Sequence, residues 1–118
     1  MKKHHISLLH AWEGILTGFK TQPNFRIHIF FSLLSLIGVW IFKVNSAELA
    51  IILFTIAAGL AFELINTAIE FTVDLLTDEY HILAKFAKDT AAGAMLIYAF
   101  FSICIAITIF LPKIWLFF

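Results

Sequence analysis

The feature that most constrains this chain is a long apolar segment, residues 47–76, that carries a row of polar side chains near its end. The row lies in the stretch ELINTAIEFTVD and consists of Glu63, Asn66, Glu70 and Asp74, at spacings of three, four and four residues. On an α-helix, at about 100° per residue, these side chains form one narrow stripe about 16 Å long. An ionisable group at membrane depth is costly and is by default a candidate functional residue. The segment therefore predicts a membrane helix with a functional face, called the polar stripe below.

The composition places this segment in a membrane protein rather than in a water-soluble domain. Of the 118 residues, 62% are hydrophobic and 14% are charged, whereas a soluble domain has about 45–50% apolar and about 25% charged residues. The length leaves room for a single domain, residues 1–118. The formal net charge is zero, so charge indicates no nucleic-acid partner. The sequence therefore predicts an all-α integral membrane protein in contact with the lipid bilayer.

Four helices are predicted, and three of them are long enough to cross a bilayer. The first is an amphipathic helix in the interface plane, whose pattern of apolar residues at helical spacing ends at Gln22-Pro23. Ser46 is expected to cap the second span, and Pro112 to mark the far interface after the third. The expected limits are about 4–20 for the surface helix, and about 25–42, 47–76 and 83–110 for the spans.

The second span is longer than the hydrocarbon requires. At about 1.5 Å per residue it makes a helix about 45 Å long, against about 30 Å of hydrocarbon. Its last turns, with Glu70 and Asp74, are therefore expected in the headgroup region and water, and Glu63 near the boundary.

The distribution of Lys and Arg predicts the orientation in the membrane. Six of these residues flank the first span and the connection after the second, and two lie on the other side. The six are Lys2, Lys3, Lys20, Arg26, Lys85 and Lys88, and the two are Lys43 and Lys113. The positive-inside rule then puts the N-terminus and the 77–88 connection in the cytoplasm. The polar stripe therefore opens on the compartment that contains ATP.

Small residues on two spans predict close contacts between helices. They are Ala57 and Ala61 on the second span, and Ala87, Ala91, Gly93 and Ala94 on the third. Such faces let helix backbones approach closely in a membrane. Because three spans and one surface helix bury little polar surface, a homo-oligomer that shares its polar stripes between subunits is expected.

The polar stripe has the donor chemistry of a metal-dependent phosphoryl-transfer site. Mg²⁺ usually takes one or two carboxylates together with substrate phosphates, and Glu70 is the best single candidate to hold it. Lys88, across the short connection, can neutralise charge on a transferring phosphoryl group, since this reaction depends mainly on positioning and electrostatics. Glu63, which is less hydrated, can accept a proton from an alcohol. No glycine-rich phosphate loop is present, so a nucleotide has to bind by another arrangement.

The same residues also have less specific interpretations. Carboxylates near a helix end are usually solvated or paired with lysine, which accounts equally well for Asp74, and Lys88 by itself is equally well an interfacial anchor. Glu63 and Asn66, inside an apolar helix, are harder to explain by packing alone. The histidines lack regular metal-ligand spacing, so no zinc site is expected. From the residues alone, a small oligomeric transporter or proton-coupled channel is about as consistent as an enzyme.

The motifs themselves resemble those of a known family. The run ELINTAIEFTVDLL, followed by AKFAKDTAAGAMLI, is similar to the signature of the small bacterial lipid kinases, the prokaryotic diacylglycerol kinase and undecaprenol kinase family. The segment AWEGILTGFKTQPNFRIH resembles that family's first helix and its approach to the first span. The resemblance implies a homotrimer in the bacterial plasma membrane, with composite active sites between neighbouring subunits. It also implies transfer of the ATP γ-phosphate to a lipid hydroxyl with Mg²⁺.

Position by position, the resemblance assigns roles to the polar stripe and to residues near it. Glu63 matches the family's general base, Asn66 the amide beside it, and Glu70 a metal-binding carboxylate. Lys88 is expected to stabilise the γ-phosphate. Further nucleotide contacts are implied for Asp74 at the end of the motif and for Asp89 after the lysine. They are also implied for the turn between the second and third spans, with Glu79, Tyr80 and His81, and for His10 on the surface helix.

Two positions bear on the metal and on the substrate. Family members often have a metal-binding glutamate where this chain has Gln22, which offers a carbonyl oxygen without the charge. This difference predicts weaker metal affinity or a different ligand set, and makes a catalytically idle relative a further interpretation. His28, in the segment NFRIH, resembles the undecaprenol-type forms. Undecaprenol is therefore the expected substrate, and diacylglycerol, which gives phosphatidic acid, is the alternative.

Overall fold

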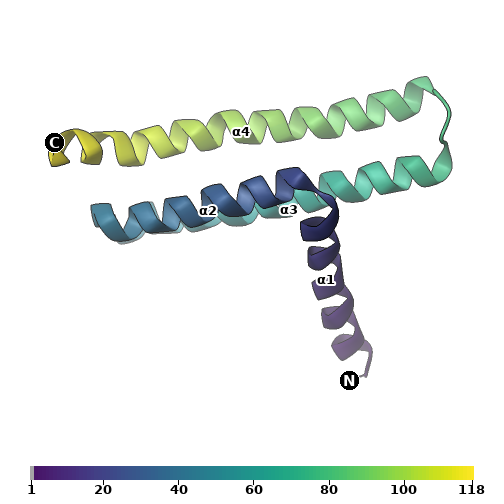
Figure 1. Ribbon diagram of the computed structural model, residues 1–118, viewed down its shortest axis with the longest axis horizontal. Helices are drawn as coiled ribbons and strands as arrows, with labels where there is room; N and C mark the ends of the chain where they lie inside the picture. Colours follow the sequence, from purple (N-terminus) through teal and green to yellow (C-terminus); the bar gives the residue numbers. More distant parts are fainter. Residues whose placement is uncertain (1) are drawn as a thin grey trace.

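The computed structural model describes the backbone of residues 2–118 and the side chains of residues 7–118. Its helices are α1 (Lys2–Thr21), α2 (Pro23–Phe42), α3 (Ser46–Leu76) and α4 (Ile82–Phe117). Helices α2, α3 and α4 form a long bundle in which α3 and α4 are an antiparallel hairpin, and α1 leaves the bundle at a steep angle (Figure 1). The predicted all-helical class is confirmed. The side chains of Lys2 and Lys3, which count toward the predicted orientation, lie outside the described residues.

The starts of α2 and α3 follow from local sequence. Gln22 adopts an extended conformation (φ −116°, ψ 106°) because a residue before proline is pushed out of the helical region, and Pro23 begins α2, where its missing N–H is not needed. Asn45 caps α3, so the prediction of Ser46 as the cap is wrong. The Asn45 side-chain oxygen accepts from the Glu48 backbone N–H at 2.8 Å, and the Glu48 carboxylate accepts from the Asn45 N–H at 3.0 Å. This capping box requires a glutamate three residues after the cap, which only Asn45 has.

Helix α4 continues beyond its predicted end. It reaches Phe117 with Pro112 inside it, so the prediction of a helix end near Phe110 is wrong. The fixed φ of proline suits a helix, and the lost hydrogen bond is tolerated in membrane helices. At its start, the His81 ring Nδ1 accepts a hydrogen bond from the Leu83 N–H at 3.1 Å and caps the helix.

The three long helices have the length and composition of membrane spans. Helices α2, α3 and α4 have 20, 31 and 36 residues and mean hydropathies of 1.9, 2.1 and 2.5. Among the side chains of residues 7–118, the buried apolar ones are Phe25, Ile52, Ala91 and Ile109, and most large apolar ones face outward. An outward surface of this kind suits a multi-pass membrane protein, in which lipid or further subunits cover it. The depth limits of the spans and the single-domain organisation remain predictions.

Helices α3 and α4 approach each other closely at Gly59. The Tyr98 ring packs against this glycine so closely that a Cβ there would overlap the ring. The Tyr98 hydroxyl also donates to the Thr55 carbonyl oxygen at 2.5 Å. Ala57 and Ala61 are exposed on the single chain. Their role in contacts between subunits therefore remains a prediction.

Candidate active site

The polar stripe lies along one side of α3 and passes from buried to exposed. Glu63 has 2% of its surface exposed, Asn66 and Glu70 are half-buried, and Asp74 is exposed. The Asn66 side-chain N–H donates to the Glu70 carboxylate at 3.3 Å, and Glu63 and Glu70 are close enough to interact electrostatically. The structure therefore brings the first three members of the stripe into one interacting group.

The Glu63 carboxylate lies in a nearly closed environment. Its Oε2 is 3.9 Å from His28 Nε2 of α2, and no hydrogen bond to it comes from the described residues. Thr67 directs its hydroxyl to the Glu63 backbone carbonyl, at 2.9 Å, instead of to the carboxylate. A buried carboxylate without hydrogen bonds is costly. Such a cost is expected where a group serves chemistry rather than packing.

Asn66 provides a second sign of an incomplete site. Its Oδ1 is buried and accepts no hydrogen bond within the part of the chain that the structure describes, although buried polar atoms are nearly always paired. This oxygen and the Glu70 carboxylate are the hard ligands that Mg²⁺ prefers, and Mg²⁺ fills its other positions with water and phosphate oxygens. The donor set therefore fits a magnesium ion. Among the described residues, no group of three or more His, Cys, Asp and Glu could hold a metal by itself.

Gln22, the second predicted metal ligand, lies at the break between α1 and α2. It is half-buried, and its Nε2 donates to the Thr21 hydroxyl at 3.3 Å. Its backbone carbonyl accepts from the Phe25 and Arg26 N–H groups of α2. No hydrogen bond joins its side chain to Glu70 in residues 7–118, so its part in a metal site remains a prediction.

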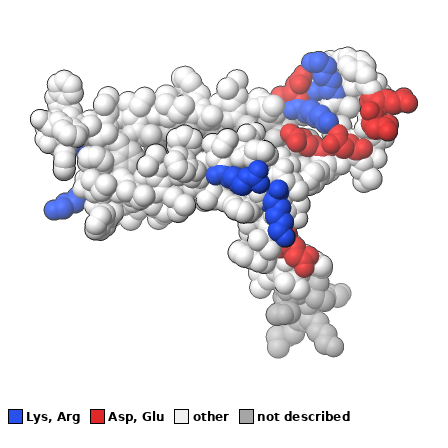
Figure 2. Space-filling view, viewed as in Figure 1, with Lys and Arg blue, Asp and Glu red and all other residues white. Residues whose placement is uncertain are grey.

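Charged side chains gather at the end of the bundle where α3 connects to α4 (Figure 2). Lys88 Nζ donates to Asp74 Oδ1 at 2.6 Å, and it also lies within electrostatic reach of Glu70. Asp89 pairs instead with Lys85, one turn earlier on α4, at 2.5 Å. The structure thus brings Lys88 to the polar stripe and leaves Asp89 exposed and paired within its own helix.

The other predicted nucleotide contacts lie at the edge of this region. Glu79 and Tyr80 are exposed in the α3–α4 connection, where the Glu79 N–H donates to the Thr77 hydroxyl at 3.1 Å. His81 serves as the cap of α4, and His10 is exposed on α1, where it lies 3.4 Å from a glutamate of its own helix. No ion pair or hydrogen bond links them to the polar stripe in the described chain. Their roles toward a nucleotide remain predictions.

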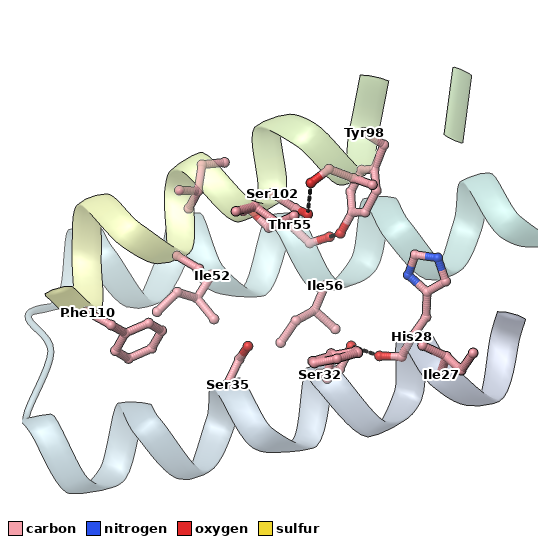
Figure 3. Close-up of a pocket in the computed structure, with 15 residues that line it drawn as sticks. Ile27, His28, Ser32, Ser35, Ile52, Thr55, Ile56, Tyr98, Ser102 and Phe110 are labelled. Atoms are coloured by element: carbon pink, nitrogen blue, oxygen red, sulfur yellow. Dashed lines mark hydrogen bonds between the residues drawn. The ribbon is translucent and has the colours of Figure 1, made fainter. Parts of the chain in front are cut away.

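A cavity of about 440 Å³ lies between α2, α3 and α4 and extends from His28 away from the charged end (Figure 3). Its wall is mostly apolar. Ser32 donates to the His28 carbonyl oxygen at 2.7 Å, and Ser102 to the Ala99 carbonyl oxygen at 2.8 Å. These hydroxyls are therefore satisfied within their own helices, and the cavity suits an apolar ligand. The sequence analysis missed this cavity and the position of His28 beside Glu63, although a histidine inside an apolar span is itself a signal.

The chain is similar to known proteins over most of its length. The sequence model of the family described as Prokaryotic diacylglycerol kinase matches residues 9–110. Undecaprenol kinase of Bacillus subtilis (strain 168) is 44% identical over 108 residues, which cover 92% of this chain and 88% of that protein. Diacylglycerol kinase of Synechocystis sp. is 36% identical over 110 residues, covering 92% of this chain and 63% of that longer protein. Diacylglycerol kinase of Escherichia coli (strain K12) is 27% identical over 88 residues, covering 75% and 72%. The family match includes the whole polar stripe and Lys88.

Proposed function

This chain belongs to the prokaryotic diacylglycerol kinase family, and we propose that it transfers the γ-phosphate of ATP to the hydroxyl group of undecaprenol. The family predicted from the motifs is confirmed. The observation that carries the proposal is the buried Glu63 carboxylate, which receives no hydrogen bond from the described residues and lies beside His28, a residue that lines an apolar cavity.

The identity of the acceptor rests on the comparisons. The relative named as an undecaprenol kinase is 44% identical, whereas the diacylglycerol kinases described above are 36% and 27% identical. Diacylglycerol is the alternative acceptor. The kinases among the relatives favour a lipid kinase over a small transporter or channel.

The groups of the proposed reaction come from α3 and α4. Glu63 takes the proton from the lipid hydroxyl, and Asn66 positions the groups around it. Lys88 stabilises the γ-phosphate, because a phosphate oxygen is as good a partner for its ammonium group as the Asp74 carboxylate is now. Its ion pair with Asp74, at 2.6 Å, already holds the Lys88 ammonium group at the exposed end of the stripe.

A magnesium ion would be held by Glu70 and the unpaired Asn66 oxygen, with Gln22 as the further predicted ligand. When bound, the ion neutralises charge on the phosphates. Nucleotide contacts are proposed for the exposed residues of this end. They are Asp74, Asp89, Glu79, Tyr80, His81 and His10.

We further propose a homotrimer with composite sites, in the bacterial plasma membrane, with the N-terminus and the charged end in the cytoplasm. In this arrangement α1 lies in the interface. It meets α3 where Gly18 packs against Leu64, and from there it runs steeply away from the bundle (Figure 1). The exposed Ala57 and Ala61 support packing between subunits.

The test is phosphate transfer from labelled ATP by purified protein in mixed micelles. Undecaprenol and diacylglycerol are offered side by side, with and without Mg²⁺. Labelled undecaprenyl phosphate should form only with Mg²⁺ and faster than phosphatidic acid. No labelled lipid from a wide panel of alcohols, in protein shown to be folded and oligomeric, would contradict the kinase and favour the transporter or the idle relative.

A further inference from the structure

The facing atoms of Glu63 and His28 lie at a separation that one hydroxyl group can bridge. Their facing atoms, Oε2 and Nε2, are 3.9 Å apart, which is too far for a direct hydrogen bond. An oxygen atom between them can lie about 2.7 Å from the carboxylate and about 2.9 Å from the nitrogen, with an angle of about 90° at the oxygen. A hydroxyl group placed there donates to Glu63 and accepts from His28, so the buried carboxylate and the partly exposed imidazole each gain a hydrogen bond.

The imidazole of His28 is held in place by its neighbours. Its ring contacts the Tyr98 ring at a centroid distance of 5.8 Å, and the Tyr98 hydroxyl is fixed to the Thr55 carbonyl oxygen. Figure 3 shows the His28 ring projecting from α2 toward the space that α3 and α4 enclose. A side chain supported in this way can orient a ligand with little loss of its own conformational freedom.

We infer that His28 binds the hydroxyl group of the lipid substrate, with Nε2–H donating to the hydroxyl oxygen while Glu63 accepts the hydroxyl proton. The inference rests on the proposed function and adds a substrate-contacting residue to it. In the transfer step the O–H bond breaks and its proton passes to the Glu63 carboxylate. The oxygen keeps the electron pair and forms the bond to the γ-phosphorus, while the bond from that phosphorus to the bridging oxygen breaks and ADP leaves. The His28 N–H stabilises the charge that develops on the attacking oxygen.

The cavity supports this position of the hydroxyl. It begins at His28 and extends away from the charged end between apolar walls. A hydrocarbon tail that follows the cavity puts its terminal hydroxyl next to His28, which faces Glu63. The nucleotide comes from the opposite, charged side. Cavities of this size enclose a drug-sized part of a ligand, so the rest of a long tail stays in the bilayer.

The experiment compares His28→Leu, which fills the space without a donor, with His28→Gln, which keeps an N–H donor. Leu33→Ala, an outward-facing position on the same helix, is the matched control. Initial rates are measured against each lipid and against ATP, and binding of a non-hydrolysable ATP analogue is measured separately. His28→Leu should lower kcat/KM for the lipid roughly 10- to 100-fold, with ATP affinity unchanged. The loss should be equal for undecaprenol and diacylglycerol, because both present a hydroxyl. His28→Gln should recover part of the rate, and Leu33→Ala should behave as wild type.

Each other outcome overturns the inference in a distinguishable way. A folded, oligomeric His28→Leu protein with wild-type rates shows that His28 makes no hydroxyl contact, while the kinase function stands. A loss for one lipid only assigns His28 to the tail, and a parallel loss of ATP affinity assigns it to the nucleotide. If the wild type phosphorylates no alcohol, the proposed function and the inference fail together. If the leucine variant does not assemble, His28→Ala takes its place under the same criteria.

Discussion

Replacing Glu63 by glutamine is the most direct test of the proposed base. Glutamine has nearly the same shape but does not accept a proton at neutral pH. Because Glu63 is 2% exposed and receives no hydrogen bond from the described residues, the substitution disturbs no existing contact of this kind. A general base contributes about 10²- to 10⁴-fold to the rate. The transfer rate should fall by that factor, which corresponds to a barrier higher by about 2.7–5.4 kcal/mol.

The same substitution should leave nucleotide binding and stability intact. Asp74, the partner of Lys88, lies eleven residues beyond Glu63 on α3, a distance of about 16 Å along the helix. The affinity for ATP should therefore change by no more than about twofold, or about 0.4 kcal/mol. A neutral amide also costs less to bury than a carboxylate, so the protein should unfold at the same temperature or a higher one.

Single-turnover transfer from labelled ATP, analogue binding and thermal unfolding measure these three quantities. Glu48→Gln is the matched control, since Glu48 lies at the other end of α3, 3.0 Å from Lys113, outside the proposed site. This control should keep the wild-type transfer rate. A Glu63→Gln protein within tenfold of the wild-type rate would refute the assignment of Glu63 as the base. A parallel loss of nucleotide binding would show that Glu63 acts through the nucleotide site.

Three further predictions concern the metal, the nucleotide and the packing. Glu70→Ala should raise the Mg²⁺ concentration for half-maximal nucleotide binding roughly tenfold or more, because it removes a charged ligand, and an unchanged Mg²⁺ titration would count against its role. Lys88→Met keeps the aliphatic stem but removes the cation that now pairs with Asp74. Steady-state kinetics should then show kcat/KM for ATP lower by roughly 10²- to 10³-fold, and an unaltered value would remove Lys88 from the site. Gly59→Ala puts a methyl group into the Tyr98 ring and should cost about 1–3 kcal/mol, measured as a lower unfolding temperature in detergent. An unshifted transition would mean that α3 and α4 separate there without cost.

The helices and the polar stripe could be predicted from sequence because each depends on local information. A proline sets the break before α2, and a helical period is enough to put Glu63, Asn66 and Glu70 on one side of α3. The cap of α3 was missed because Asn45 and Ser46 are both good caps, and only the capping-box glutamate three residues later distinguishes them.

Contacts between helices were harder to predict because they depend on how each helix is rotated about its axis. Helix α2 is apolar nearly all round, so its sequence has no strong period to indicate which side meets α3. The contact of His28 with Glu63 follows from tertiary packing instead. Asp89 shows the same limit, because the resemblance implied a nucleotide contact beside Lys88, whereas in the structure its carboxylate pairs with Lys85 on its own helix.

The length of α3 has a functional reason once α1 is placed in the interface as proposed. Gly18 of α1 packs against Leu64, the residue after Glu63, so in the proposed arrangement the membrane surface lies at the level of the proposed base. A lipid alcohol whose tail stays in the bilayer can bring its hydroxyl to this level but not much beyond it. ATP, in contrast, needs water and cations. Both are available along roughly the next 16 Å of helix. There the side chains of the stripe pass from buried Glu63 to exposed Asp74, which pairs with the cation of Lys88. A second span that ended at the membrane surface would carry the base and have nothing to hold the nucleotide, so a kinase of this design needs a helix longer than the bilayer.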